Sequence, residues 1–272
     1  MSSESSSNTA VTALAKENTN PGQMRELFEA LTSDKDHLFS VIQSDSEEVL
    51  LAILRNPELD HQHILTLLKR RLPGSVIAAI FASKRLIETQ SVKFALVAHH
   101  DTPPHIAQTL LPFLYIFELL KLCLIPGISA DIQLAAERRI IQQIKTQPLG
   151  NKLTLARRGK SAILEPLLRE GLLNVVEICL DNPHLKEGSL YQFLASSLAS
   201  AETISMVARN SRWKNRPNIR LAILKNPRTP LTLFPALLSG LPGATLRELL
   251  TSPRLTFAQK ELVRQAASHP HI

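Results

Sequence analysis

The sequence predicts an all-α fold, an α–α superhelix (solenoid) that is built from helical hairpin repeats and is internally duplicated. Apolar residues recur at helical spacing, as in Val49, Leu50 and Ile53 and again in Ile204 and Val207. The apolar and polar alternation of strands is not seen, and similar segments return along the chain. Because such repeats bury their apolar faces against their neighbours, we expect a stack of hairpins.

Each repeated segment is an apolar helix end followed by a turn. The clearest pair is LAILRNPEL at residues 51–59 and LAILKNPRT at residues 221–229. Looser copies are VVEICLDNPHL at residues 175–185 and FALVAHHDTP at residues 94–103. We expect the turn asparagine to adopt the left-handed conformation at the helix end, and the proline after it to prevent the helix from continuing.

Alignment on this turn divides the chain into two copies. The intervals between turns alternate between about 27 and 16 residues, so we interpret residues 30–141 and 156–268 as copies offset by 126 or 127. The combined interval of about 43 residues is interpreted as a helix, a turn, a second helix and a connection. In the Thr-Pro pairs at 102–103 and 229–230, threonine is expected to cap the next helix and proline to begin it. The aligned turn positions are Asn56, Ser83, His99, Asn182, Asn210, Asn226, Ser252 and Ser268.

The copies define the expected domain organisation. Residues 1–22 lack the basic and apolar regions of a secretory signal and are predicted to be a disordered N-terminal tail. Residues 23–146 form the first set of helical repeats and residues 147–272 the second, in one continuous superhelix. The boundary is placed near Pro148 and Gly150, which break the helical pattern.

The most hydrophobic stretch, Ile106–Ile128, is interrupted by Pro112 and several polar residues, so we expect two buried helices and no membrane span. Cys123 and Cys179 each lie in an apolar run, where a free cysteine behaves as a small hydrophobic residue. The expected location is therefore the reducing cytoplasm, and a disulfide between the two is the alternative.

Charge is spread unevenly along the 272 residues, whose formal net charge is +7. Residues 1–60 hold 4 basic and 11 acidic side chains, and residues 61–272 hold 27 and 13. Between Arg209 and Arg228 seven cations stand without an acid, around the single tryptophan. Such a segment attracts phosphate or carboxylate, and an aromatic ring beside arginines stacks on a base or a guanidinium. The candidate residues for binding an anionic partner are Arg209, Arg212, Trp213, Lys214, Arg216 and Arg220.

A structural role is the competing interpretation of these cations. Several of them would then form salt bridges inside the protein or cap helix C-termini, and Trp213 would fill the gap between repeats. The basic pairs Arg70-Arg71, Arg138-Arg139 and Arg157-Arg158 would extend the cationic surface if they share one face with it.

The sequence predicts no catalytic or cofactor site. No glycine-rich phosphate loop and no glycine-flanked nucleophile is present. The segment HHDTPPH places His99, His100, Asp101 and His105 within seven positions, a spacing that suits metal ligands. Its alignment with an exposed turn favours solvated histidines instead, so we predict no metal site, and His61 and His63 would complete one only from a neighbouring repeat.

The Asn-Pro-x-Thr-Pro turn of LAILKNPRTPLTL resembles the leucine-rich repeat variant, an all-helical module of the HEAT-like group. The resemblance covers most of residues 30–270 and extends to uncharacterised bacterial repeat proteins. It implies a HEAT-like helical repeat fold and an interaction scaffold in a bacterial cytoplasm.

The first functional hypothesis is therefore a non-enzymatic scaffold that binds a protein or peptide partner carrying an acidic segment. The alternative is binding of nucleic acid or another polyanion through the basic face, with a HEAT-like DNA glycosylase as its enzymatic form. A third is autoinhibition or self-association, in which the acidic N-terminal part pairs with the basic remainder of the same or another molecule.

Overall fold

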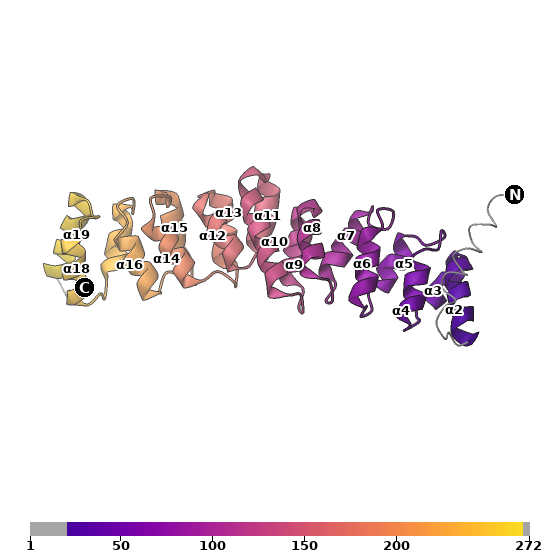
Figure 1. Cartoon of the computed structure of the whole chain (residues 1–272). Coiled ribbons are helices and arrows are strands. Elements are labelled where there is room, and N and C mark those ends of the chain that lie inside the picture. Colours follow the sequence, from indigo (N-terminus) through magenta and orange to yellow (C-terminus); the bar gives the residue numbers. More distant parts are fainter. Residues whose placement is uncertain (1–20, 269–272) are drawn as a thin grey trace. The chain divides into compact units, whose positions relative to one another are not determined.

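The computed structural model describes residues 21–268, and these residues form α-helices and short 3-10 turns without a strand (Figure 1). The all-α prediction is therefore confirmed. Of the predicted tail, residues 1–20 lie outside the described residues, and the last two residues of that prediction begin the helix α2 (Pro21–Thr32).

The chain divides into two compact units. The first contains residues up to Glu118 together with Leu124–Ala135, and the second contains Leu119–Cys123 together with residues from Ala136 onward. The helices α9 (Ile116–Leu124) and α10 (Ala130–Gln143) contribute residues to both units. The predicted boundary at residue 147 precedes α11 (Leu149–Arg158) and stays a prediction.

In the first unit the helices from α2 to α7 form two rows, in which each helix packs against the next but one. The helices α2, α4 and α6 make one row, and α3, α5 and α7 make the other (Figure 1). The bounds are α3 (Lys35–Val41), α4 (Glu47–Ile53), α5 (His61–Leu67), α6 (Gly74–Ala82), α7 (Gln90–Ala98), α8 (Pro104–Leu110) and the 3-10 turn η1 (Leu111–Phe113).

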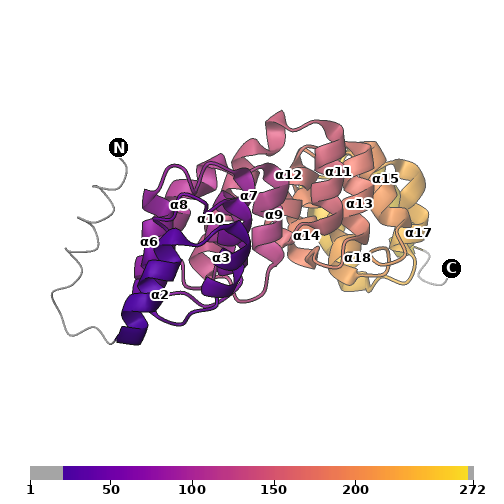
Figure 2. The same ribbon diagram turned by 90° about the vertical axis from the view of Figure 1, so that its right-hand side faces the viewer.

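The second unit repeats this packing. The helices α11, α13 and α15 lie side by side in one row (Figure 2). In the other row α14 packs against both α12 and α16. The helices α17, α18 and α19 pack together at the C-terminal end. The bounds are η2 (Ile144–Thr146), α12 (Ser161–Arg169), α13 (Leu173–Asp181), α14 (Glu187–Ala195), α15 (Ala201–Arg209), α16 (Pro217–Leu224), η3 (Leu231–Leu233), α17 (Phe234–Leu238), α18 (Gly243–Thr251) and α19 (Phe257–Ser268).

The helices are short and depend on burial of one apolar stripe each. In α15, Ile204 and Val207 are fully buried, while Glu202 and Arg209 face solvent. Ser200 begins this helix, because its hydroxyl accepts a hydrogen bond from the Thr203 N–H. Isolated helices of nine residues are marginal in water, so packing of the rows supplies most of their stability.

The predicted repeat length of 43 residues is wrong. The interval from Asn56 to His99 contains three helices, α5, α6 and α7, and the interval from Asn182 to Asn226 contains α14, α15 and α16. The structural repeat is a pair of helices of about 28 residues, because the contacts between successive pairs join residues 28 apart, as from Arg85 to Pro57.

The turn asparagines join successive repeats. The Asn56 side chain is buried and donates from Nδ2 to the carbonyl oxygens of Ala30 and Ser33, both at 3.0 Å. Asn182 donates in the same way to Ala156, at 2.8 Å, and to Gly159, at 3.2 Å. In each case the acceptors lie 26 and 23 residues earlier, in the preceding turn of the same row.

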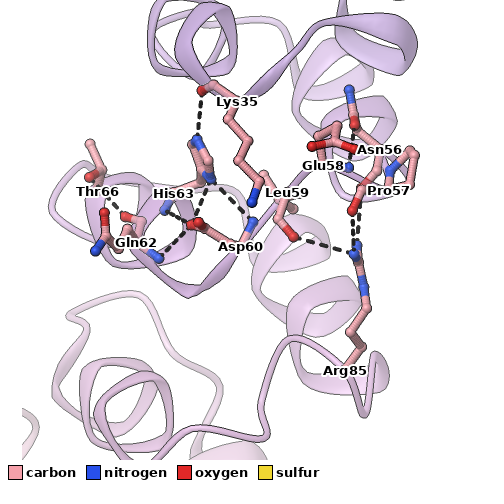
Figure 3. Close-up of polar contacts among 10 residues, drawn as sticks. All are labelled: Lys35, Asn56, Pro57, Glu58, Leu59, Asp60, Gln62, His63, Thr66 and Arg85. Atoms are coloured by element: carbon pink, nitrogen blue, oxygen red, sulfur yellow. Dashed lines mark hydrogen bonds and ion pairs between the residues drawn. The ribbon is translucent and has the colours of Figure 1, made fainter.

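The carbonyl oxygens of these turns accept hydrogen bonds from the following repeat. The Arg85 guanidinium binds the carbonyl oxygens of Asn56, Pro57 and Leu59 at 3.0, 2.9 and 3.3 Å (Figure 3). Arg212 binds the equivalent oxygens of Asn182, Pro183 and Leu185, at 2.6, 3.3 and 3.2 Å. The Gln259 amide does the same for Asn226, Pro227 and Thr229, at 3.4, 3.1 and 3.1 Å. Arginine and glutamine thus bond the carbonyl oxygens of the preceding turn, of which the asparagine carbonyl also accepts a backbone N–H from its own turn.

The expected left-handed conformation of the asparagines is wrong. No described residue other than glycine has a positive φ, and Asn182 is extended, with φ −69° and ψ 126°. The proline after it favours this conformation. The Asn182 Oδ1 accepts from the His184 N–H at 2.7 Å, an Asx turn that closes the loop.

The expected N-caps at the Thr-Pro pairs are also wrong. The Thr102 and Thr229 hydroxyls donate backwards, to the carbonyl oxygens of Leu96, at 2.6 Å, and Ile223, at 2.5 Å. Both threonines are buried and satisfy the end of the preceding helix. The residue that precedes α8 in the cap position is Pro103.

The apolar stretch Ile106–Ile128 forms α8, η1 and α9, as two predicted helices with a 3-10 turn between them. No helix within residues 21–268 is long and apolar enough to cross a membrane. Cys123 and Cys179 are both buried and are not joined by a disulfide, so the disulfide alternative is wrong.

Candidate anion-binding edge

Three turns of the second unit are hydrogen-bonded into a continuous edge. They are residues 157–161 between α11 and α12, residues 181–189 between α13 and α14, and residues 209–218 between α15 and α16. Asn182 bonds the second turn to the first, through the carbonyl oxygens of the first turn. Arg212 bonds the third turn to the second. Packed helices lie about 8–10 Å apart, so the three turns extend over roughly 20 Å.

The cationic edge is the set of basic side chains on these three turns. Eight cations stand there against two acids, Asp181 and Glu187. The acids are engaged within the edge, because Asp181 accepts from Asn210 at 3.1 Å and Glu187 accepts from Asn218 at 3.0 Å. The basic side chains are Arg157, Arg158, Lys160, Lys186, Arg209, Arg212, Lys214 and Arg216.

Cations occupy the N-cap position of all three helices that begin on this edge, namely Lys160 of α12, Lys186 of α14 and Arg216 of α16. None of the three caps its helix through its side chain. Serine, threonine, aspartate and asparagine stabilise this position, whereas a cation opposes the helix dipole. The choice of residue therefore adds positive charge to the edge at a cost in helix stability.

Among the predicted site residues, Arg212 and Trp213 are structural. Trp213 is 2% exposed and donates from its ring nitrogen to the Leu180 carbonyl oxygen at 2.9 Å. The Arg212 guanidinium stacks on this ring, 4.5 Å from its centroid, while it binds the carbonyl oxygens of the preceding turn. The buried indole leaves no ring face for a nucleobase, and the alternative of stacking on a guanidinium is met by Arg212 of the same chain.

The other predicted residues divide between solvent and the protein. The Arg209 and Lys214 side chains are exposed, without a hydrogen bond or ion pair to any part of the chain that the structure describes. Arg216 lies 3.6 Å from Glu187 and is more than half exposed. Arg220 lies away from the edge and donates to the carbonyl oxygens of Leu237, at 2.6 Å, and Ser239. Burial lowers the pKa of Arg220.

The end of the cationic segment is also engaged within the protein. Lys225 pairs with Glu248 at 2.5 Å, and Arg228 donates to the Ser197 carbonyl oxygen at 2.6 Å. The competing structural interpretation therefore holds for Arg212, Arg220, Lys225 and Arg228. Arg209, Lys214 and the exposed part of Arg216 remain available to a partner.

The structure shows where two of the basic pairs noted in the sequence lie, and it adds two further cations to the edge. Arg157 and Arg158 are exposed on the first turn, whereas Arg70 is engaged in the first unit, where it donates to the Ile42 carbonyl oxygen and pairs with Asp45. Lys160 and Lys186 were not singled out. The sequence signal for Lys186 was the 28-residue repeat, which places Arg158, Lys186 and Lys214 at equal intervals.

The histidine cluster is used within the first unit. The His99 Nε2 donates to the Arg70 carbonyl oxygen at 2.7 Å while Nδ1 accepts from the Asp101 N–H, and His100 contacts the Asp101 carboxylate at 3.0 Å. His63 is similar: Nε2 donates to the Lys35 carbonyl oxygen at 2.9 Å and Nδ1 accepts from the Asp60 N–H (Figure 3). Within residues 21–268 no group of three potential ligands is arranged to hold a metal ion.

The charge of the described residues differs strongly between the two units. The first unit holds 9 lysines and arginines against 13 aspartates and glutamates, a net charge of −4. The second holds 21 against 9, a net charge of +12. Half of this excess lies on the cationic edge, whose eight cations and two acids give a net charge of +6.

Comparisons with known proteins identify no relative. No family model, no curated protein and no solved structure matches this chain.

Proposed function

We propose that this chain is a non-enzymatic scaffold, a HEAT-like helical repeat solenoid whose cationic edge binds an acidic segment of a protein partner. The two-row packing of helices and the recurring bonds between turns support the repeat architecture. The observation that carries the proposed function is the edge itself, where three bonded turns hold eight cations and two acids.

An acidic peptide segment fits this edge because the free cations lie on successive turns. An extended peptide covers about 3.3 Å per residue, so roughly six residues would reach from the first turn to the third. Arg158, Lys186 and Lys214 are exposed, and one lies on each turn. Carboxylates along such a segment would meet a cation at every helix pair, without a deep pocket.

Nucleic acid is the second candidate partner. The net charge of +12 on the second unit favours it, because phosphate neutralisation supplies most of the affinity of non-specific binding. Against single-stranded nucleic acid stands the burial of Trp213, since such proteins stack bases on exposed aromatic rings. Duplex DNA, which needs only phosphate contacts, is therefore the form to test.

The test reverses one exposed cation on each turn, in the triple variant Arg158→Glu, Lys186→Glu and Lys214→Glu. A matched control makes the same change in charge at three exposed cations outside the edge, with Arg138→Glu, Lys145→Glu and Arg247→Glu. Binding of a labelled oligoglutamate peptide and of a labelled DNA duplex is followed by fluorescence anisotropy at 50 and 150 mM salt.

We expect the edge variant to bind the peptide at least tenfold more weakly, because three exposed ion pairs of up to about 1 kcal/mol each are replaced by repulsion. The control should lose less than threefold. Equal losses in both variants would show that net charge alone attracts the peptide and would overturn the site. Tighter binding of the duplex than of the peptide would support the second candidate.

A further inference from the structure

A pocket of 660 Å³ lies on the second unit beside the cationic edge. Its walls come from α13, from α15 and from Pro230, which precedes η3. After α16 the chain forms a 3-10 turn and the five-residue helix α17, whereas α13 and α15 have nine residues each.

The pocket combines an apolar surface with unpaired charges. Leu180, Met206 and Pro230 contribute apolar atoms to its lining. Glu177 and Glu202 are exposed on its walls, and neither makes a hydrogen bond or an ion pair with any described residue. Arg209, which is equally unpaired, belongs both to this pocket and to the cationic edge.

The carboxylates of this unit that have no lysine or arginine partner are concentrated at this pocket. Its described part holds 21 basic and 9 acidic side chains, and five of the acids form ion pairs with lysine or arginine. Three of the remaining four line this one pocket, where Asp181 accepts only from the neutral Asn210 amide. Arg209 is the one cation among the lining residues, so this pocket keeps a net charge of −2 in a unit with a large excess of cations, and none of its three carboxylates forms an ion pair with it.

We propose that this pocket binds a basic side chain of the partner, so that the recognised segment is a lysine or arginine flanked by acidic residues. The inference rests on the proposed function, because it extends the peptide site from the edge into the pocket. The methylene stem of the basic side chain lies on Leu180 and Met206, and its charged head meets Glu177 and Glu202. The acidic residues beside it continue from Arg209 along the edge.

The charges of the two surfaces select this pattern over a uniformly acidic one. A purely acidic segment places carboxylates against Glu177 and Glu202, which repel it, and a purely basic one is repelled by the edge. A segment with one basic residue satisfies both surfaces. Arg209 lies where they meet and pairs with the acidic residue next to the basic one.

The test uses two labelled peptides, each with six glutamates around one central residue, which is lysine in the first and Nε-acetyl-lysine in the second. The acetylated peptide carries one more net negative charge, so attraction by the edge alone would make it the tighter ligand. We expect the lysine peptide to bind the unaltered protein about fivefold more tightly, the effect of one partly exposed ion pair.

The pocket variant Glu177→Gln with Glu202→Gln should lose this preference, and the matched control Glu165→Gln with Glu261→Gln should keep it. A preference that survives in the pocket variant, or equal binding of both peptides to the unaltered protein, would overturn the inference while leaving the proposed function intact. Circular dichroism melts check that both variants are folded.

If neither peptide binds, the proposed function fails and the pocket is tested alone. A neutral peptide with a single lysine between glycines is then titrated to millimolar concentration and followed by protein NMR. Shifts confined to the amides around Glu177 and Glu202, and absent from the pocket variant, would support the pocket. The absence of such shifts would overturn it.

Discussion

Replacement of Asn182 by alanine tests the hydrogen bonds that join successive repeats. The side chain is 3% exposed, and its Nδ2 donates to the carbonyl oxygens of Ala156, Arg157 and Gly159 at 2.8, 3.1 and 3.2 Å. Its Oδ1 accepts from the His184 N–H at 2.7 Å. Alanine removes two N–H donors that are shared among three carbonyl groups, together with the Oδ1 acceptor, and it leaves buried carbonyl groups without a partner.

At about 1 kcal/mol for each hydrogen bond, we expect the free energy of unfolding to fall by about 3–4 kcal/mol. The matched control is Asn210→Ala, at the equivalent turn one repeat later. Asn210 is half-buried and makes two side-chain hydrogen bonds, to Asp181 at 3.1 Å and from the Arg212 N–H at 3.0 Å. Its loss should cost about 1 kcal/mol, because solvent replaces part of what is removed.

The assay is urea unfolding followed by circular dichroism at 222 nm, with midpoints compared at equal slope. A second variant, Asn182→Asp, keeps the acceptor for His184 and places a carboxylate oxygen against three carbonyl oxygens. It should be at least as destabilised as Asn182→Ala. If Asn182→Ala lowers the free energy of unfolding by no more than Asn210→Ala does, or if Asn182→Asp is as stable as the unaltered protein, the carbonyl contacts do not stabilise the repeats.

Three further outcomes are expected. Burial raises the pKa of the Cys179 thiol from 9.0 to about 12, so above pH 9 the unfolded chain loses a proton that the folded chain keeps, and stability falls as pH rises towards 12. Cys179→Ala should flatten this fall in urea midpoints measured at pH 8 and 10.5. Thr229→Val removes the buried hydroxyl that bonds Ile223 and should lower the unfolding free energy by about 1–2 kcal/mol, whereas Thr229→Ser should cost less. Burial alone would raise the pKa of the Asp60 carboxyl, but the N–H groups of His63 and Gln62 and the His63 ring together lower this pKa. The ionised Asp60 carboxylate therefore stabilises the fold above its ordinary pKa of 3.8, and this stabilisation is lost as pH falls below that value. The difference in melting temperature between the unaltered protein and Asp60→Asn should therefore shrink between pH 5 and pH 3.

Local rules in the sequence predicted much of the fold. The apolar spacing of Ile204 and Val207 located α15, and the aligned turn positions His99, Asn182 and Asn210 are all helix C-caps in the structure. The repeat length failed because similar turns end the helices of both rows. Alignment by turn chemistry therefore equated Asn210 with Asn226, which follow adjacent helices in different rows.

The candidate site was predicted in part. A run of seven cations is visible in the sequence, but the group that each of these side chains binds is not. Arg212 and Arg220 reach carbonyl oxygens at the ends of other helices, and those oxygens are brought near only when the rows pack. Lys186 lies 28 residues from Lys214 and joins the same surface because one helix pair separates them.

The sequence by itself determined that the chain is helical, that it is built from repeats and that its excess of basic residues lies in the C-terminal part. These properties depend on residue spacing and composition, which act along the chain. The tertiary structure decided which cations are free. A guanidinium near an unsatisfied carbonyl group is held by the fold, as at Arg212, and one without such a neighbour faces solvent, as at Arg209. Packing of helices distant in sequence determines which of these two environments each arginine meets.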